Sequence, residues 1–395
     1  MRRHSADHYI LLFIGILILI GLIVLYSVGP ALNYRLGEGV YDQNSFLYRQ
    51  ITSIAVALGA FYFASRLPAK SWAKLIKPLL IVSAITNVLL LIPGVGITQN
   101  GATRWIGLFG FSFQPVELLK LTLLVYFAYF LSEQLNRGRP DWKMILRNST
   151  LILGVLGVLS VVLQRDLGSM VVLVGMMAGM LFVAGQPLID FAKLIGGLVA
   201  AATVAVIAFP HRLERLTTFL NPGSDVQGSG YHVQQALIAI GSGGLMGLGL
   251  GKSIQSFGYV PESANDSIFA IFAEKFGFIG AVVLIGLFSL LFARIYRVAK
   301  NTSDHFSRLL VVGVFIWLVS HVIINIGAML ALMPLTGITL PLISLGGSSL
   351  LILMMGLGIV YQVSRYTDRQ MSNTRGRRRQ SGVSEATRRR IARGA

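Results

Sequence analysis

The chain has 395 residues, of which 54% are apolar and 13% are charged, and its mean hydropathy is +0.70. Water-soluble domains average about 25% charged residues, so this composition excludes a soluble domain and indicates an integral membrane protein. The net charge is +18, but so apolar a chain is not a nucleic-acid-binding protein merely because it is basic. The absence of Cys excludes disulfides, thiolate metal sites and Cys nucleophiles, and the six His lack metal-ligand spacing.

Ten apolar segments follow one another along the chain, each close to the length of about 20 residues that crosses the hydrocarbon core. They are Tyr9–Val28, Gln50–Leu67, Ile76–Ile92, Gln114–Leu131, Ser149–Gln164, Leu167–Ala184, Ile189–Phe209, Ser267–Phe292, Leu309–Leu330 and Pro341–Ser364. The sequence therefore predicts an all-α, polytopic fold with ten transmembrane helices. The first segment is interpreted as a retained anchor, because Pro30 stands where a signal peptide would be cleaved.

The fifth and sixth segments abut, which leaves open a nine-helix alternative with one long span. That alternative would place the charges of Arg165 and Asp166 in the middle of the membrane, a costly position. Ten helices are therefore preferred.

The distribution of Lys and Arg predicts the orientation. Of the 34 Lys and Arg, 25 fall on the side that holds both termini and seven on the other side. By the positive-inside rule both termini are cytoplasmic. Residues 1–365 are predicted to form the transmembrane domain, and 366–395 a disordered, basic cytoplasmic tail. Its Arg triplets would contact anionic lipid head groups or a cytosolic partner.

A long outer loop, residues 210–266, separates the seventh and eighth segments. Its amphipathic stretch Val233–Ile240 favours an ordered structure. Gly251-Lys252-Ser253 resembles a nucleotide-binding P-loop, but Met246 occupies the position of the required first Gly. The glycines from 241 to 251 are therefore interpreted as close-packing or turn positions.

Polar and ionisable side chains collect at the outer ends of the predicted helices. The candidate site residues are Arg104, Gln114, Glu117, Lys120, Arg165, Asp166, Arg215, Glu262, Asp266, Gly347 and Ser348. Ionisable groups near a membrane are candidates for function.

Each also has a structural alternative. Glu117 and Lys120 could be an i, i+3 ion pair, Asp166 and Asp266 could cap helices, and Gly347 could serve helix packing. Independent structural pairs, however, have no reason to share one leaflet, so a common outer cavity is favoured.

The chemistry available at such a cavity is limited, because no nucleotide is present outside the cell to activate a substrate. A lipid-linked sugar diphosphate carries its own leaving group, and its tail, diphosphate and sugar match the bilayer, the head-group level and water. Arg104, Lys120, Arg165 and Arg215, with the helix N-terminus at Gly347-Ser348, could hold the diphosphate. A carboxylate at the water boundary could act as base.

Four motifs in order now point to a family. They are 100–106 (Asn-Gly-Ala-Thr-Arg-Trp-Ile) with 111–117 (Phe-Ser-Phe-Gln-Pro-Val-Glu), 164–168 (Gln-Arg-Asp-Leu-Gly), 228–231 through 259–262, and 339–344 with 346–349 (Gly-Gly-Ser-Ser). In order and topology the chain resembles the SEDS proteins, the family of FtsW and RodA, over roughly residues 9 to 365. It departs from the family pattern at Val116, Ser267, Lys275, Leu345 and residues 263–265.

The resemblance implies a SEDS-type ten-helix fold and a glycosyltransferase that polymerises lipid II into peptidoglycan glycan strands. By position, Asp266 matches the family's catalytic base, and Glu117 and Lys120 match its helix-four pair. The implied partners are lipid II, a class B penicillin-binding protein, other division proteins and membrane lipids, without nucleic acid. The implied location is the bacterial cytoplasmic membrane at the division septum, because 337–342 and the basic tail are more similar to FtsW than to RodA.

One base without a second nucleophile predicts direct displacement with inversion at the sugar, and cations would neutralise the leaving diphosphate. A divalent cation (Mg²⁺ or Mn²⁺) could also neutralise the charge of the leaving diphosphate, although no cluster of ligand residues in the sequence specifies one. Two alternatives stay open: a lipid II flippase without chemistry, and a scaffold that recruits division proteins.

Overall fold

The computed structural model describes residues 6–36, 45–99, 102–108, 111–156, 164, 166–207, 217, 219, 228–255 and 259–367. Its helices are α1 (His8–Leu36), α2 (Ser45–Arg66), α3 (Ala69–Lys74), α4 (Ile76–Leu89), α5 (Pro115–Asn136), α6 (Trp142–Leu156), α7 (Leu167–Ala184), α8 (Leu188–Ile207), α10 (Ser229–Ser242), α11 (Ile268–Lys300), α12 (His305–Met329) and α13 (Gly347–Val363), with a 3-10 turn at Ser364–Tyr366.

Each of the ten predicted segments overlaps one of these helices, with 157–163 and 208–209 outside the described residues, and the helical fold class is confirmed. Within the described residues, seven helices are long and apolar enough to cross a membrane: α1, α2, α5, α7, α11, α12 and α13. The count of ten crossings therefore stays a prediction. The division between the fifth and sixth segments is supported, because α7 begins at Leu167 with Asp166 as its N-cap.

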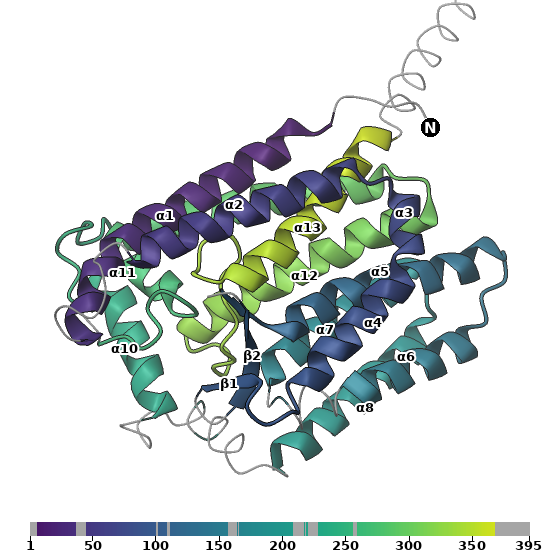
Figure 1. The fold of residues 1–395 in the computed structure, drawn as a ribbon, viewed down its shortest axis with the longest axis horizontal. Helices are drawn as coiled ribbons and strands as arrows, with labels where there is room; N and C mark the ends of the chain where they lie inside the picture. The colour runs from purple at the N-terminus through teal and green to yellow at the C-terminus, as the bar shows by residue number, and fades with distance from the viewer. Residues whose placement is uncertain are drawn as a thin grey trace, which may run out of the picture.

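The helices run roughly along one common direction in layers (Figure 1). Helix α12 contacts α5, α7, α11 and α13, while α2 packs along α13. Helices α5, α12 and α13 are predominantly apolar and largely buried, as expected of central helices. Gly358 lets α2 and α13 approach closely, because a Cβ there would lie 2.7 Å from the Phe61 carbonyl oxygen.

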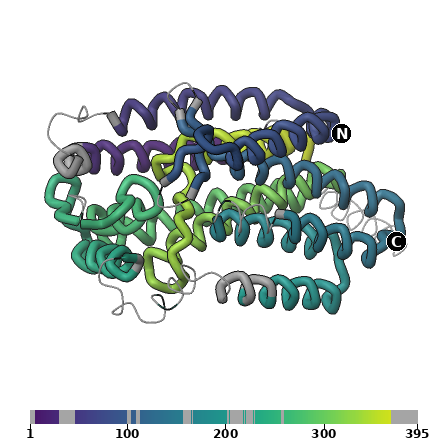
Figure 2. The backbone as a smooth tube through the Cα atoms, turned by 60° about the horizontal axis from the view of Figure 1, so that its bottom comes forward, coloured from purple at the N-terminus to yellow at the C-terminus, as the bar shows by residue number. Residues whose placement is uncertain are grey.

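Helices α6 and α8 lie beside each other at one edge of the bundle (Figure 2). The amphipathic stretch expected to be ordered in the long loop forms α10, at the same end of the molecule as the start of α11 (Figure 1).

A small sheet supplements the predicted helices. Strands β1 (Gly96–Gln99), β2 (Ala102–Leu108) and β3 (Phe111–Phe113) are antiparallel in the order β1-β2-β3, with Gly96 opposite Ile106 and Ile106 opposite Phe113. The sheet leads directly into α5 and so places Arg104 and Gln114 at the start of that helix.

Helix α11 is interrupted at Gly277, whose φ of 67° and ψ of −169° is a conformation open to glycine. The interruption frees backbone groups, and the loop after α10 bonds them: Leu248 and Gly249 donate to the carbonyls of Glu274 and Lys275, and Phe278 donates to Gly244. A Cβ on Gly247 would collide with the Lys275 carbonyl. The loop supports the close-packing interpretation for Gly243 and Gly247, whereas Gly244 and Gly249, with φ of 53° and 84° and open space around an added Cβ, are turn positions.

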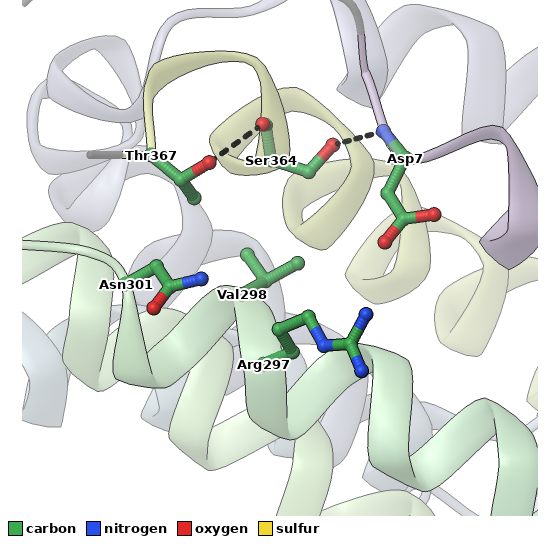
Figure 3. A pocket seen from close by; sticks show the side chains of 6 residues that line it. All are labelled: Asp7, Arg297, Val298, Asn301, Ser364 and Thr367. Atoms are coloured by element: carbon green, nitrogen blue, oxygen red, sulfur yellow. Dashed lines mark hydrogen bonds between the residues drawn. The ribbon is translucent and has the colours of Figure 1, made fainter. Parts of the chain in front are cut away.

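The two ends of the described chain meet beside the end of α11 (Figure 3). The Asp7 amide donates to Ser364 Oγ (3.1 Å), and Arg294 Nη1 lies 3.9 Å from Asp7 Oδ2. Asp7, Arg297, Asn301, Ser364 and Thr367 line a small polar pocket there. Both ends thus lie on one side of the bundle, as expected; that this side is cytoplasmic stays a prediction. Residues 368–395 of the predicted tail lie outside the described residues.

Candidate active site

The loop between α12 and α13, residues 330–346, lies against several of the candidate residues selected from the sequence. A turn at Leu340–Ser344 gives it a defined shape, because the Leu340 amide donates to Ser344 Oγ (2.8 Å) and the Ser344 amide to the Leu340 carbonyl (3.0 Å). Gly337, with φ of 73°, provides a second bend. The Leu345 amide donates to the Ala264 carbonyl (2.9 Å) and joins this loop to the segment that carries Asp266.

Asp266 lies against the α12–α13 loop and is half-buried. Asn325 Nδ2 donates to the carbonyls of Asp266 and Ile338, at 2.7 Å each. The carboxylate lies beside Gly337, where an added Cβ would be 3.9 Å from Asp266 Oδ2. The N-cap of α11 is Ser267, without a side-chain capping bond. The capping alternative for Asp266 is therefore not supported.

Asp166 has the capping role that the sequence suggested as its alternative. Its Oδ1 accepts from the Ser169 amide (3.0 Å), and its Oδ2 accepts from Gln114 Nε2 (3.3 Å). Gly168 lies against the same α12–α13 loop, because a Cβ there would be 3.0 Å from the Thr336 carbonyl oxygen. Asp166 and Gln114 thus fix the start of α7 to the start of α5. Their contact with a substrate stays a prediction.

Arg104 on β2 is half-buried at the same end of the bundle. Its Nε donates to the Gln164 carbonyl (3.0 Å), and Gln164 Nε2 donates to Asn87 Oδ1 on α4 (2.7 Å). Sequence reasoning did not select Asn87, because an isolated amide within an apolar segment carries no spacing signal.

Glu117 and Lys120 form the predicted ion pair, with 2.9 Å between Glu117 Oε1 and Lys120 Nζ and side chains 5% and 1% exposed. Lys120 Nζ also lies 3.3 Å from His321 Nε2, and Trp317 Nε1 donates to that nitrogen (3.1 Å). The other carboxylate oxygen, Glu117 Oε2, is buried without a hydrogen-bond partner among the residues described. The pair is thus part of a larger buried cluster.

The remaining candidates differ in their surroundings. Glu262 is exposed, has a φ of 49°, and accepts a hydrogen bond from Asn265 Nδ2. Gly347 packs against α2, since a Cβ there would lie 3.0 Å from Ser53 Oγ; this supports the packing alternative. Ser348 Oγ is buried and has no hydrogen-bond partner within the described part of the chain. Arg165 and Arg215 lie outside the described residues.

The described residues contain no group of three or more His, Asp or Glu placed to hold a metal ion. A divalent cation therefore stays a prediction, and no protein ligand set is assigned to it.

Known proteins are similar to this chain in sequence and fold. The family model described as "Cell cycle protein", of FtsW, RodA and SpoVE, matches residues 7–369. The chain belongs to this family. Stage V sporulation protein E of Bacillus subtilis is 37% identical over 371 residues, which cover 93% of this chain and 99% of the relative. A probable peptidoglycan glycosyltransferase FtsW of Saccharophagus degradans is 38% identical over 360 residues, covering 90% and 92%.

Solved structures of the FtsW/RodA/SpoVE family have the same fold. One chain of a peptidoglycan synthase complex, studied for the coordination of polymerization and crosslinking, superposes with a TM-score of 0.73 at 28% identity, covering 92% of this chain and 99% of that one. Thermus thermophilus RodA superposes with a TM-score of 0.66 at 30% identity, with the same coverage.

Proposed function

We propose that this chain is a peptidoglycan glycosyltransferase that polymerises lipid II at the outer face of the bacterial cytoplasmic membrane, with Asp266 as general base. The names of its FtsW relatives support the glycosyltransferase class. The observation that carries the chemistry is that a carboxylate before α11 and a buried cation on α5 lie beside neighbouring turns of α12. Asn325 binds the backbone of Asp266, and His321 contacts Lys120. These two α12 residues are four positions apart, about 6 Å along the axis.

In the proposed reaction, a sugar hydroxyl attacks the anomeric carbon of lipid-linked substrate while its proton passes to the Asp266 carboxylate. The new glycosidic bond forms as the bond from the anomeric carbon to the diphosphate oxygen breaks, and the diphosphate leaves with the electron pair. Lys120 and Arg104 are proposed to stabilise the leaving diphosphate electrostatically. Attack from the opposite face inverts the anomeric configuration.

A class B penicillin-binding protein is the proposed partner. The superposed peptidoglycan synthase complex couples polymerization with crosslinking, and its coverage of this chain supports an equivalent assembly here. The more specific location, the division septum, follows from the similarity to FtsW and belongs to the same proposal.

Incubation of the purified protein with labelled lipid II, with and without a class B penicillin-binding protein, tests this function. The expected product is a ladder of glycan polymers. A protein that moves lipid II across liposome membranes but forms no polymer under any of these conditions would instead be a flippase.

A further inference from the structure

Three polar side chains lie at four-residue intervals on α12: Trp317, His321 and Asn325. Their exposed fractions are 1%, 4% and 2%, and residues at this spacing share one face of a helix. Buried polar groups are costly unless they are hydrogen-bonded. Each of the three makes a hydrogen bond in the cluster around Lys120 and Asp266.

The hydrogen bonds determine where the proton of His321 resides. Trp317 Nε1 and Lys120 Nζ both approach His321 Nε2, at 3.1 Å and 3.3 Å. Indole N–H and ammonium groups are donors only, so Nε2 must be the acceptor. The ring proton is then on Nδ1. His321 is therefore the neutral, Nδ1-protonated tautomer.

Hydrogen bonds also fix the orientation of the Lys120 ammonium group. An ammonium group has three donors; within the described residues, Glu117 Oε1 and His321 Nε2 account for two of them. Two fixed acceptors leave the third N–H with a defined direction. Without His321, Glu117 on the same helix would be the only acceptor left to the Lys120 ammonium among the described residues.

We propose that His321 is a positioning residue, which aims the third N–H of Lys120 at the leaving diphosphate, while Asn325 one turn away holds Asp266. Helix α12 thus fixes the separation between the cation and the base. This inference rests on the proposed glycosyltransferase function and assigns His321 a role in it.

Two substitutions of His321 distinguish a positioning role from a role in packing alone. In His321→Gln the amide oxygen can still accept from Lys120, so polymerisation is expected within about threefold of the wild type. In His321→Leu the side chain remains large and apolar but has no acceptor. A displacement of about 1 Å can lower a rate about 100-fold, so kcat is expected to fall by about that factor, with KM for lipid II little changed.

His305→Gln is the matched control, because His305 is exposed and begins the same helix. Thermal unfolding of all three variants in detergent shows which are folded. Wild-type kcat in a folded His321→Leu protein, or equal loss in folded Gln and Leu variants, would overturn the proposal.

A second measurement does not depend on activity. Nitrogen-15 NMR of the histidine rings in lipid bilayers, with the His321 signal assigned by its loss in His321→Gln, reports the tautomer directly. An unprotonated Nε2 and a protonated Nδ1 are expected. A ring protonated at Nε2 would overturn the inference even in an active enzyme. If the wild-type protein forms no polymer, the proposed function fails, while the NMR result still tests the geometry.

Discussion

Replacing Lys120 with Met removes the cation from a buried pair and leaves the Glu117 carboxylate without its partner. The two side chains are 1% and 5% exposed, so water does not compensate the remaining charge. Breaking a buried pair in this way costs about 3–5 kcal/mol of the free energy of unfolding. Glu117→Leu should have a similar cost, because it leaves the Lys120 ammonium with only His321 Nε2 as acceptor among the described residues.

The double variant Glu117→Leu with Lys120→Met separates stability from activity. Replacing both charges with apolar groups of similar volume is often neutral or stabilising, so thermal unfolding should return close to that of the wild type. Lipid II polymerisation should nevertheless stay reduced by about 10²–10³-fold, the cost of losing one group that stabilises charge in a transition state.

A matched control exists on α8, where Asp190 and Lys193 form an ion pair with the same i, i+3 spacing. Lys193 is 66% exposed, so Lys193→Met should change the free energy of unfolding by no more than about 1 kcal/mol. The assays are thermal unfolding in detergent and product analysis with labelled lipid II. Full polymerase activity in the double variant would refute a chemical role for Lys120 and show that the pair is only structural.

Three further predictions follow from the loop at the α11 interruption and from the tail. Gly277→Ala should destabilise the protein, because its φ of 67° is strained for Ala and the new Cβ would collide with Gly247 and Leu245; thermal unfolding at a lower temperature checks this. Glu274→Ala should destabilise it by several kcal/mol, since that buried carboxylate accepts from Ser253 and two backbone amides and charge-assisted bonds contribute about 1.5–3 kcal/mol each; unchanged unfolding would contradict this. Deleting Gly376–Ala395 should leave lipid II polymerisation intact but alter cellular placement or partner recruitment, measured by fluorescence microscopy, and loss of activity in a folded, monodisperse truncation would argue against a purely targeting role.

Local signals made part of the fold predictable. Apolar runs near 20 residues correspond to the helices, and Asp166 before Leu167-Gly168 marked the start of α7. The i, i+3 spacing revealed the Glu117–Lys120 pair because both partners are on one helix.

The features that could not be predicted depend on distant contacts. Lys120 and His321 are 201 positions apart, and nothing in either neighbourhood identifies the other. The interruption of α11 lies inside one predicted segment, Ser267–Phe292, and its position depends on how the loop after α10 binds the freed backbone groups. The sheet at 96–113 was missed because its strands are short and are stabilised by pairing with one another.

The central claim is that Asp266 removes the proton from the attacking hydroxyl, and the Asp266→Asn variant tests it most directly. Asn retains the shape of the side chain and the backbone carbonyl that binds Asn325, but it cannot accept a proton at this site. The measurement compares the initial rates of lipid II polymerisation by wild-type and variant protein, each purified with the same class B penicillin-binding protein. We predict a loss of at least about 10²–10⁴-fold with unchanged thermal unfolding; polymerisation by the variant at the wild-type rate would contradict the account.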